Sequence, residues 1–100
     1  MRQPHMSIEN ITNEAIGAHI LYKLARKRRW GGKHTELRNC IKSLDPKLHE
    51  RGEACAGALI KKGLLLHGPK TGETHVSLNP ARKGEILGVI RKYLGSNVWV

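Results

Sequence analysis

Six histidines and two cysteines are the side chains of this sequence that are suited to metal binding or nucleophilic chemistry. The histidines are His5, His19, His34, His49, His67 and His75. Their spacing contains no Cys-x-x-Cys pair and no two histidines four residues apart on one helix. His67 and His75 flank a predicted hairpin loop, across which they could face each other. The spacing favours surface or phosphate-facing histidines, so we expect no metal and no cofactor.

Catalytic motifs are equally sparse. Cys40 and Cys55 fall on the inward sides of two predicted helices, which favours buried thiols over a redox pair or metal ligands. The run Gly68-Pro69-Lys70-Thr71-Gly72 has the residue types of a phosphate-binding loop, but a hairpin is the wrong setting for one. No paired carboxylates or nucleophile elbow accompany it. We therefore expect that the protein is not an enzyme.

The charge balance points instead to a polyanionic partner. Eighteen Lys and Arg residues face eight Asp and Glu residues, for a formal net charge of +10 and a pI near 10.1. Such a chain favours nucleic acid, because neutralised phosphates release condensed counterions. Anionic membranes and acidic proteins would also attract it. No apolar run approaches the roughly 20 residues of a membrane helix, and no signal peptide is visible, so we expect a cytoplasmic protein without a membrane partner.

A chain of 100 residues predicts one domain over residues 1–100, with an ordered core over about 10–94. The absence of Phe predicts an aliphatic core. The first helix is expected from about Asn10 to Arg29, with Thr12 as its N-cap and an apolar stripe of Ile16, Ile20 and Leu24. Gly31-Gly32 is expected to end it.

Two more helices are predicted next. A short helix is expected to begin at Thr35 and Glu36, with its apolar side formed by Leu37, Cys40, Ile41 and Leu44. Asp45-Pro46 predicts a turn, because the residue before proline is driven out of the helical region. Pro46 suits the first position of a third helix, which is expected to run to Lys62.

After Gly63 the periodicity changes to that of strands. The sequence predicts strands at Leu64–His67 and Thr74–Leu78 around a turn-rich loop, and then a last helix from Pro80 to Leu94 that Gly95 ends. The fold class is therefore expected to be α+β and mainly α, with the order helix, helix, turn, helix, β-hairpin, helix.

This order, together with the stretch Ala58 to Pro80, resembles the winged helix-turn-helix family, and small microbial regulators, archaeal ones in particular, fit best. The resemblance implies a three-helix core, a β-hairpin wing and a C-terminal helix. It implies double-stranded DNA binding through a recognition helix (about 46–62) and a basic wing (about 64–78). The role would be that of a transcriptional regulator or a replication or chromatin accessory.

The resemblance also implies the contact residues. Arg51, on the outer side of the recognition helix, is the candidate for reading a guanine edge, and His49 would contact a base or a phosphate. The remaining candidates are Lys33, His34, Thr35, Arg38, Lys42, Lys47, Lys61, Lys62, Lys70 and Thr71. A secondary basic patch, either a second phosphate contact or a solvated helix end, comprises Arg26, Lys27, Arg28 and Arg29.

Two glutamates argue against DNA reading by an ordinary recognition helix. Glu50 and Glu53 near its start would repel phosphate, although they also suit the helix dipole. RNA binding in translation and protein docking by the same fold therefore remain alternatives. A homodimer is possible, and the apolar tail Val98-Trp99-Val100 would either cover the core or join a second chain.

Overall fold

The structure is a computed structural model, and it describes residues 11–68 and 74–95. The elements are, in chain order, α1 (Asn13–Arg26), β1 (Thr35–Glu36), α2 (Arg38–Ile41), η1 (Pro46–Leu48), α3 (His49–Lys61), β2 (Leu65–His67), β3 (His75–Leu78), η2 (Pro80–Arg82) and α4 (Lys83–Leu94). The three strands form an antiparallel sheet in the order β1-β3-β2. The fold is α+β and mainly helical, which confirms the expected class.

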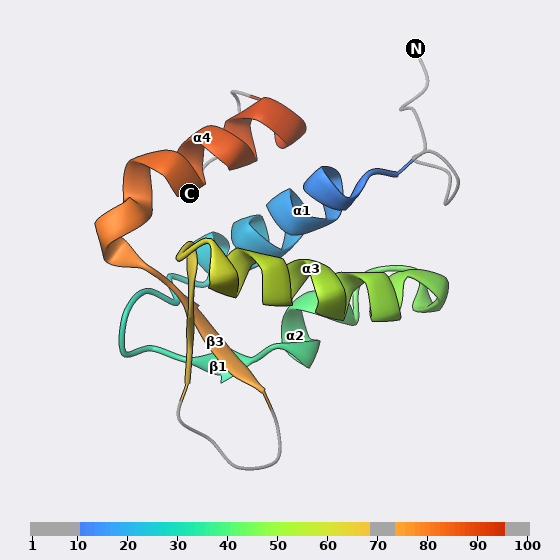
Figure 1. Ribbon diagram of the computed structural model, residues 1–100, viewed down its shortest axis with the longest axis horizontal. Coiled ribbons are helices and arrows are strands. Elements are labelled where there is room, and N and C mark those ends of the chain that lie inside the picture. Colours follow the sequence, from blue (N-terminus) through green and yellow to red (C-terminus); the bar gives the residue numbers. More distant parts are fainter. Residues whose placement is uncertain (1–10, 69–73, 96–100) are drawn as a thin grey trace.

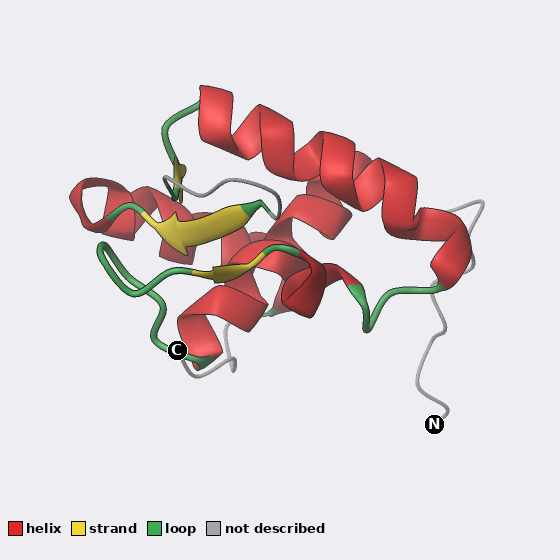
Figure 2. Ribbon diagram, turned by 90° about the horizontal axis from the view of Figure 1, so that it is seen from below, coloured by secondary structure: helices red, strands yellow, loops and turns green. Residues whose placement is uncertain are grey.

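Helix α1 lies at the centre of the molecule. Figure 1 shows it between α4 on one side and α3 on the other, with the sheet and α2 beyond α3. Its apolar stripe explains this position, because Ile16, Ile20, Leu21 and Leu24 are all fully buried. Figure 2, from below, shows the strands in front of the helices. The core is aliphatic, as expected from the absence of Phe.

Three side-chain caps set the helix starts, and the sequence predicted the first of them, Thr12. The Thr12 hydroxyl accepts a hydrogen bond from the Ala15 N–H at 3.0 Å and begins α1. The Asp45 carboxylate accepts from the Lys47 N–H at 2.9 Å before η1, and the Asn79 side chain accepts from the Ala81 N–H at 3.0 Å before η2. Each cap satisfies a backbone donor that the helix itself leaves unpaired, so these boundaries are locally encoded.

The end of α1 differs from the prediction. The helix stops at Arg26, and Arg28 has a left-handed φ of 56°. The Arg29 N–H reaches back to the Leu24 carbonyl at 2.9 Å, which is the bond that closes a helix end through a left-handed residue. Gly31 does not end the helix. Its N–H donates a hydrogen bond to the Leu78 carbonyl at 2.9 Å, which holds the loop after α1 along β3.

The expected helix start at Thr35 is wrong. Thr35 and Glu36 form β1, where Thr35 pairs with Val76 and Glu36 with His75. Helix α2 begins only at Arg38 and spans four residues. A two-residue strand has no periodicity of its own, so only its partner β3 shows that these residues are extended.

The hairpin register separates His67 and His75, which the sequence alone allowed to face each other across the loop. His67 pairs with Val76, while the Gly68 N–H donates to the His75 carbonyl at 2.7 Å. Paired residues share a face of a sheet and successive residues alternate between faces, so His67 and His75 lie on opposite faces.

Gly68 is buried at the base of the hairpin, where no side chain fits. A Cβ there would lie 2.9 Å from the His75 Cβ and 3.3 Å from the His34 ring. We expect Gly68→Ala to lower the free energy of unfolding by about 1–3 kcal/mol, measured by urea denaturation. Gly32→Ala is the control, because a Cβ at Gly32 meets nothing within 4 Å. Equal effects of the two changes would contradict the packing argument.

Within residues 11–68 and 74–95, no helix is long and apolar enough to span a membrane.

Candidate nucleic-acid interface

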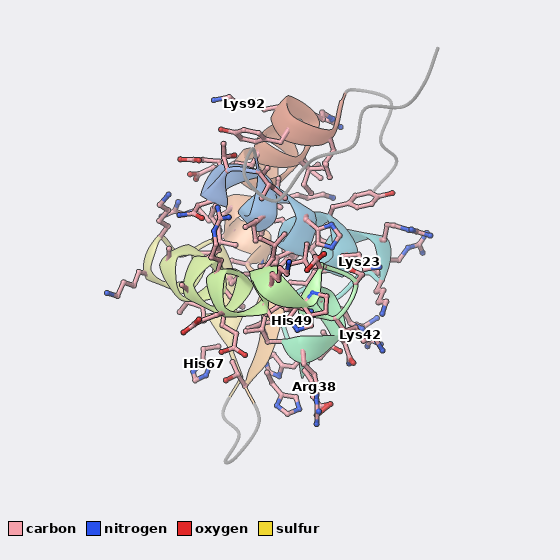
Figure 3. All side chains as sticks on the ribbon, turned by 90° about the vertical axis from the view of Figure 1, so that its right-hand side faces the viewer. Lys23, Arg38, Lys42, His49, His67 and Lys92 are labelled. Atoms are coloured by element: carbon pink, nitrogen blue, oxygen red, sulfur yellow. The ribbon has the colours of Figure 1, made fainter. Side chains whose placement is uncertain are left out.

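Five cations lie on the C-terminal half of α1, on α2 and at the residues that cap the ends of these helices, and we refer to them as the α1–α2 basic surface. They are Lys23, Arg26, Lys27, Arg38 and Lys42. Lys23, Arg26 and Lys27 are spaced by three and four residues, so they share one side of α1. Arg38 and Lys42 are four apart at the two ends of α2. Figure 3 shows Lys23, Lys42 and Arg38 along one side of the molecule.

Side chains of α1 interact with α2 and with the residues after it at this surface. A His19 ring nitrogen lies 2.9 Å from the Ser43 hydroxyl oxygen, which ties the middle of α1 to the residues after α2. Burial raises the pKa of the Cys40 thiol to about 11, while the nearby charges of Lys27 and Lys23 oppose the rise. Burial and then Lys23 lower the pKa of His19, so this imidazole is neutral at neutral pH. The surface therefore owes its charge to lysine and arginine.

Among the described residues, Glu36 brings a carboxylate close to Arg38. Arg38 Nε lies 3.9 Å from Glu36 Oε1, and the Arg38 side chain is 67 % exposed. An exposed ion pair at this distance is weak, because water screens it and both side chains lose freedom.

The four basic residues from Arg26 to Arg29 differ in their exposure to solvent. Arg26, Lys27 and Arg28 are exposed, whereas Arg29 is half-buried and its Nε is shielded from solvent without a hydrogen-bond partner. The Arg29 backbone is also engaged, since its carbonyl accepts from the Leu78 N–H at 2.8 Å. Of the proposed secondary patch, Arg29 thus belongs to the folded interior of the loop.

Arg28 occupies a conformation that favours glycine, at an estimated cost of about 1 kcal/mol for a residue with a side chain. We expect Arg28→Gly to stabilise the fold by about 0.5–1 kcal/mol in thermal or urea unfolding. If Arg28 contacts phosphate, the same change weakens binding to duplex DNA and lowers the salt dependence. Stabilisation with unchanged affinity would remove Arg28 from the interface.

At the start of α3, the two most specific candidates have hydrogen-bond partners within the chain. Arg51 was expected on the free outer side of the helix, but its guanidinium donates to Asn13 Oδ1 at 2.8 and 3.1 Å and to the Ile11 carbonyl at 3.0 Å. A His49 ring nitrogen lies 3.0 Å from the Leu44 carbonyl oxygen. Both side chains are half-buried and hold the start of α3 to neighbouring segments of the chain.

The outer side of α3 has little positive charge. Its exposed residues up to the last turn are Glu50, Glu53, Ala54, Gly57 and Ala58. Lys61 and Lys62 add exposed cations only at its C-terminal end. A helix with this surface offers carboxylates and methyl groups to a DNA groove, and phosphates repel the former.

The predicted contacts around β1 are partly structural. The His34 ring packs at the Gly68 position, and the Thr35 hydroxyl accepts from the Asn39 amide at 3.1 Å. Lys33 and Lys47 are exposed. The wing-tip candidates Lys70 and Thr71, like the tail Val98-Trp99-Val100, lie outside the described residues.

Two residues that shape the site were missed by sequence reasoning. Lys23 was not chosen, although its spacing of three and four residues from Arg26 and Lys27 is a readable signal. Asn13, which holds Arg51, gave no signal, because the two residues are 38 apart in the chain.

The cysteines are buried and free, as predicted. In the part of the chain that the structure describes, no group of three or more His, Cys, Asp or Glu side chains is placed to hold a metal ion.

Comparison with models of protein families, with curated protein sequences and with solved structures gives no match to this chain.

Proposed function

We propose that this protein is a winged helix-turn-helix domain that binds double-stranded DNA chiefly through its phosphate backbone. The contacts come from the α1–α2 basic surface and from Lys33, which precedes β1. The observation that carries the proposal is that five cations share this surface, four of them on exposed residues.

The order of the elements supports the fold assignment. Helix α1 is followed by the short strand β1 and by α2. The Asp45-Pro46 turn then joins α2 to η1 and α3, and β2 and β3 form a hairpin directly after α3. In the sheet β3 lies between β1 and β2, so the hairpin is joined to the segment that precedes α2. This is the arrangement expected of a helix-turn-helix with a wing.

Binding through phosphates rather than base edges follows from the surroundings of α3. A base-reading helix presents Arg, Asn, Gln or Lys side chains to the groove. Here Arg51 and His49 are held by other segments of the chain, and the exposed positions before the last turn are acidic or small. We therefore infer an affinity that depends little on base sequence.

A protein with this binding mode would serve as a chromatin or replication accessory, or as a transcriptional regulator that obtains its sequence preference from a partner protein. RNA duplexes offer a similar density of phosphates, so the experiment includes them as competitors.

The test is a fluorescence anisotropy titration of the full chain with two 20-base-pair DNA duplexes of unrelated sequence at several salt concentrations. With six phosphate contacts, the slope of log K against log salt is about −5, so affinity falls roughly 10³-fold between 50 and 200 mM salt. The two duplexes are expected to bind alike, and more tightly than an RNA duplex. Absence of binding at low salt would refute the proposed function.

Arg51→Ala tests whether Arg51 stabilises the fold or contacts a DNA base. The change removes hydrogen bonds to Asn13 and Ile11, so we expect the free energy of unfolding to fall by about 1–2 kcal/mol in urea. DNA affinity is expected to stay within about twofold, since Arg51 supplies none of the proposed phosphate contacts. Loss of affinity for one duplex and not the other would restore Arg51 as a base reader.

A further inference from the structure

A groove lies between α1, α3 and α4, on a part of the molecule that the α1–α2 basic surface does not reach. Its volume is about 400 Å³, within the range of small-molecule sites. Lys92, on its α4 side, and Arg38 lie toward opposite ends of the view in Figure 3. The groove therefore adds a second surface, whose occupant need not be nucleic acid.

The lining of the groove is mainly apolar. It includes Gly17, Ala18, Cys55, Leu59, Leu64 and Val89. Tyr93 borders it and is 37 % exposed, which makes it the exposed large hydrophobic side chain of the described residues. An aliphatic or aromatic group that entered the groove would cover this ring and the apolar wall, and removal of this surface from water favours binding.

Cations border this apolar wall. Among the described residues, Arg51, Lys62 and Lys92 line the groove together with one carboxylate, that of Glu14. Arg51 is fixed in place by Asn13, and Lys92 Nζ lies 5.3 Å from the centre of the Tyr93 ring. The electrostatic balance favours an anionic head beside an apolar chain, because one negative charge gains attraction from more cations than the one carboxylate repels.

We propose that this groove binds a small amphiphile with an apolar chain and a carboxylate head. A phosphodiester backbone fits the α1–α2 basic surface better, since it would leave the apolar wall of the groove uncovered. Three helices meet at the groove, so such a ligand would stabilise the packing of α3 and α4 against α1. The proposal stands apart from nucleic-acid binding and does not need it.

The test compares three probes with the same ten-carbon chain: decanoate, decanol and decylammonium. Each is titrated into the full chain below its aggregation concentration, and the backbone amides are followed by nuclear magnetic resonance. Decanoate is expected to shift the amides of Ala54, Ala58 and Val89 and to raise the melting temperature, with the neutral and cationic probes binding more weakly. Equal binding of all three, or shifts confined to α2 and the end of α1, would overturn the proposal.

Ala58→Leu blocks the groove from an exposed position and should weaken decanoate binding by about tenfold or more. Ala81→Leu, an equal change at an exposed residue outside the groove lining, should leave binding intact. Lys62→Glu keeps the apolar wall and should shift preference from decanoate toward decylammonium by about fivefold. Groove resonances that move with protein concentration before any probe is added would show that a second copy occupies the groove, and would also overturn the proposal.

Discussion

The double change Lys23→Glu and Lys42→Glu is expected to weaken binding to duplex DNA by about 10²-fold at 50 mM salt, because it removes two phosphate contacts and adds two repulsions. The slope of log K against log salt should also become shallower by about two. Lys42 is exposed and Lys23 half-buried, and Figure 3 shows both on the same side of the molecule. The measurement is the same anisotropy titration, after circular dichroism has shown that the variant is folded.

Lys83→Glu with Lys92→Glu is the matched control. It lowers the net charge by the same amount, but it does so on α4, at two lysines that are not part of the α1–α2 basic surface. Each of these lysines lies over an aromatic ring, Trp30 and Tyr93 respectively, and neither contact is buried enough to decide the fold. An equal loss of affinity in both double variants would show that only total charge matters and that no defined interface exists.

The largest expected effect on stability is that of Leu78→Ala. Leu78 is fully buried at the end of β3, pairs with Leu65 of β2, and its backbone bonds both to Arg29 and to Gly31. Truncation leaves a cavity where the sheet, α1 and the loop after α1 meet. We expect the free energy of unfolding to fall by about 2–5 kcal/mol, measured by urea denaturation.

Leu66→Ala is the control, because Leu66 is the next residue along β2 from Leu65 but is only half-buried. Its truncation is expected to cost about 1 kcal/mol or less, since less apolar surface returns to water. If the two variants were equally stable, Leu78 would not be the point at which the sheet is fixed to the helices.

The segments with a repeating pattern were predictable because their structure is encoded locally. The apolar spacing of Ile16, Ile20 and Leu24 predicts α1, and the caps Thr12, Asp45 and Asn79 predict where helices begin. Both kinds of signal act within a few residues, so they survive in the bare sequence. The burial of Cys40 and Cys55 follows from the same periodicity.

The sequence by itself determined the order of the four helices and the two hairpin strands, the aliphatic core and the excess of positive charge. Only the tertiary structure decided that Thr35 is in a strand, that Arg51 is bonded to Asn13, and that Lys23 and Lys42 lie on one side of the molecule. The physical reason is that these three facts depend on residues far apart in the chain. Their energies arise when α1, α2, α3 and the sheet pack together, and no local pattern records them.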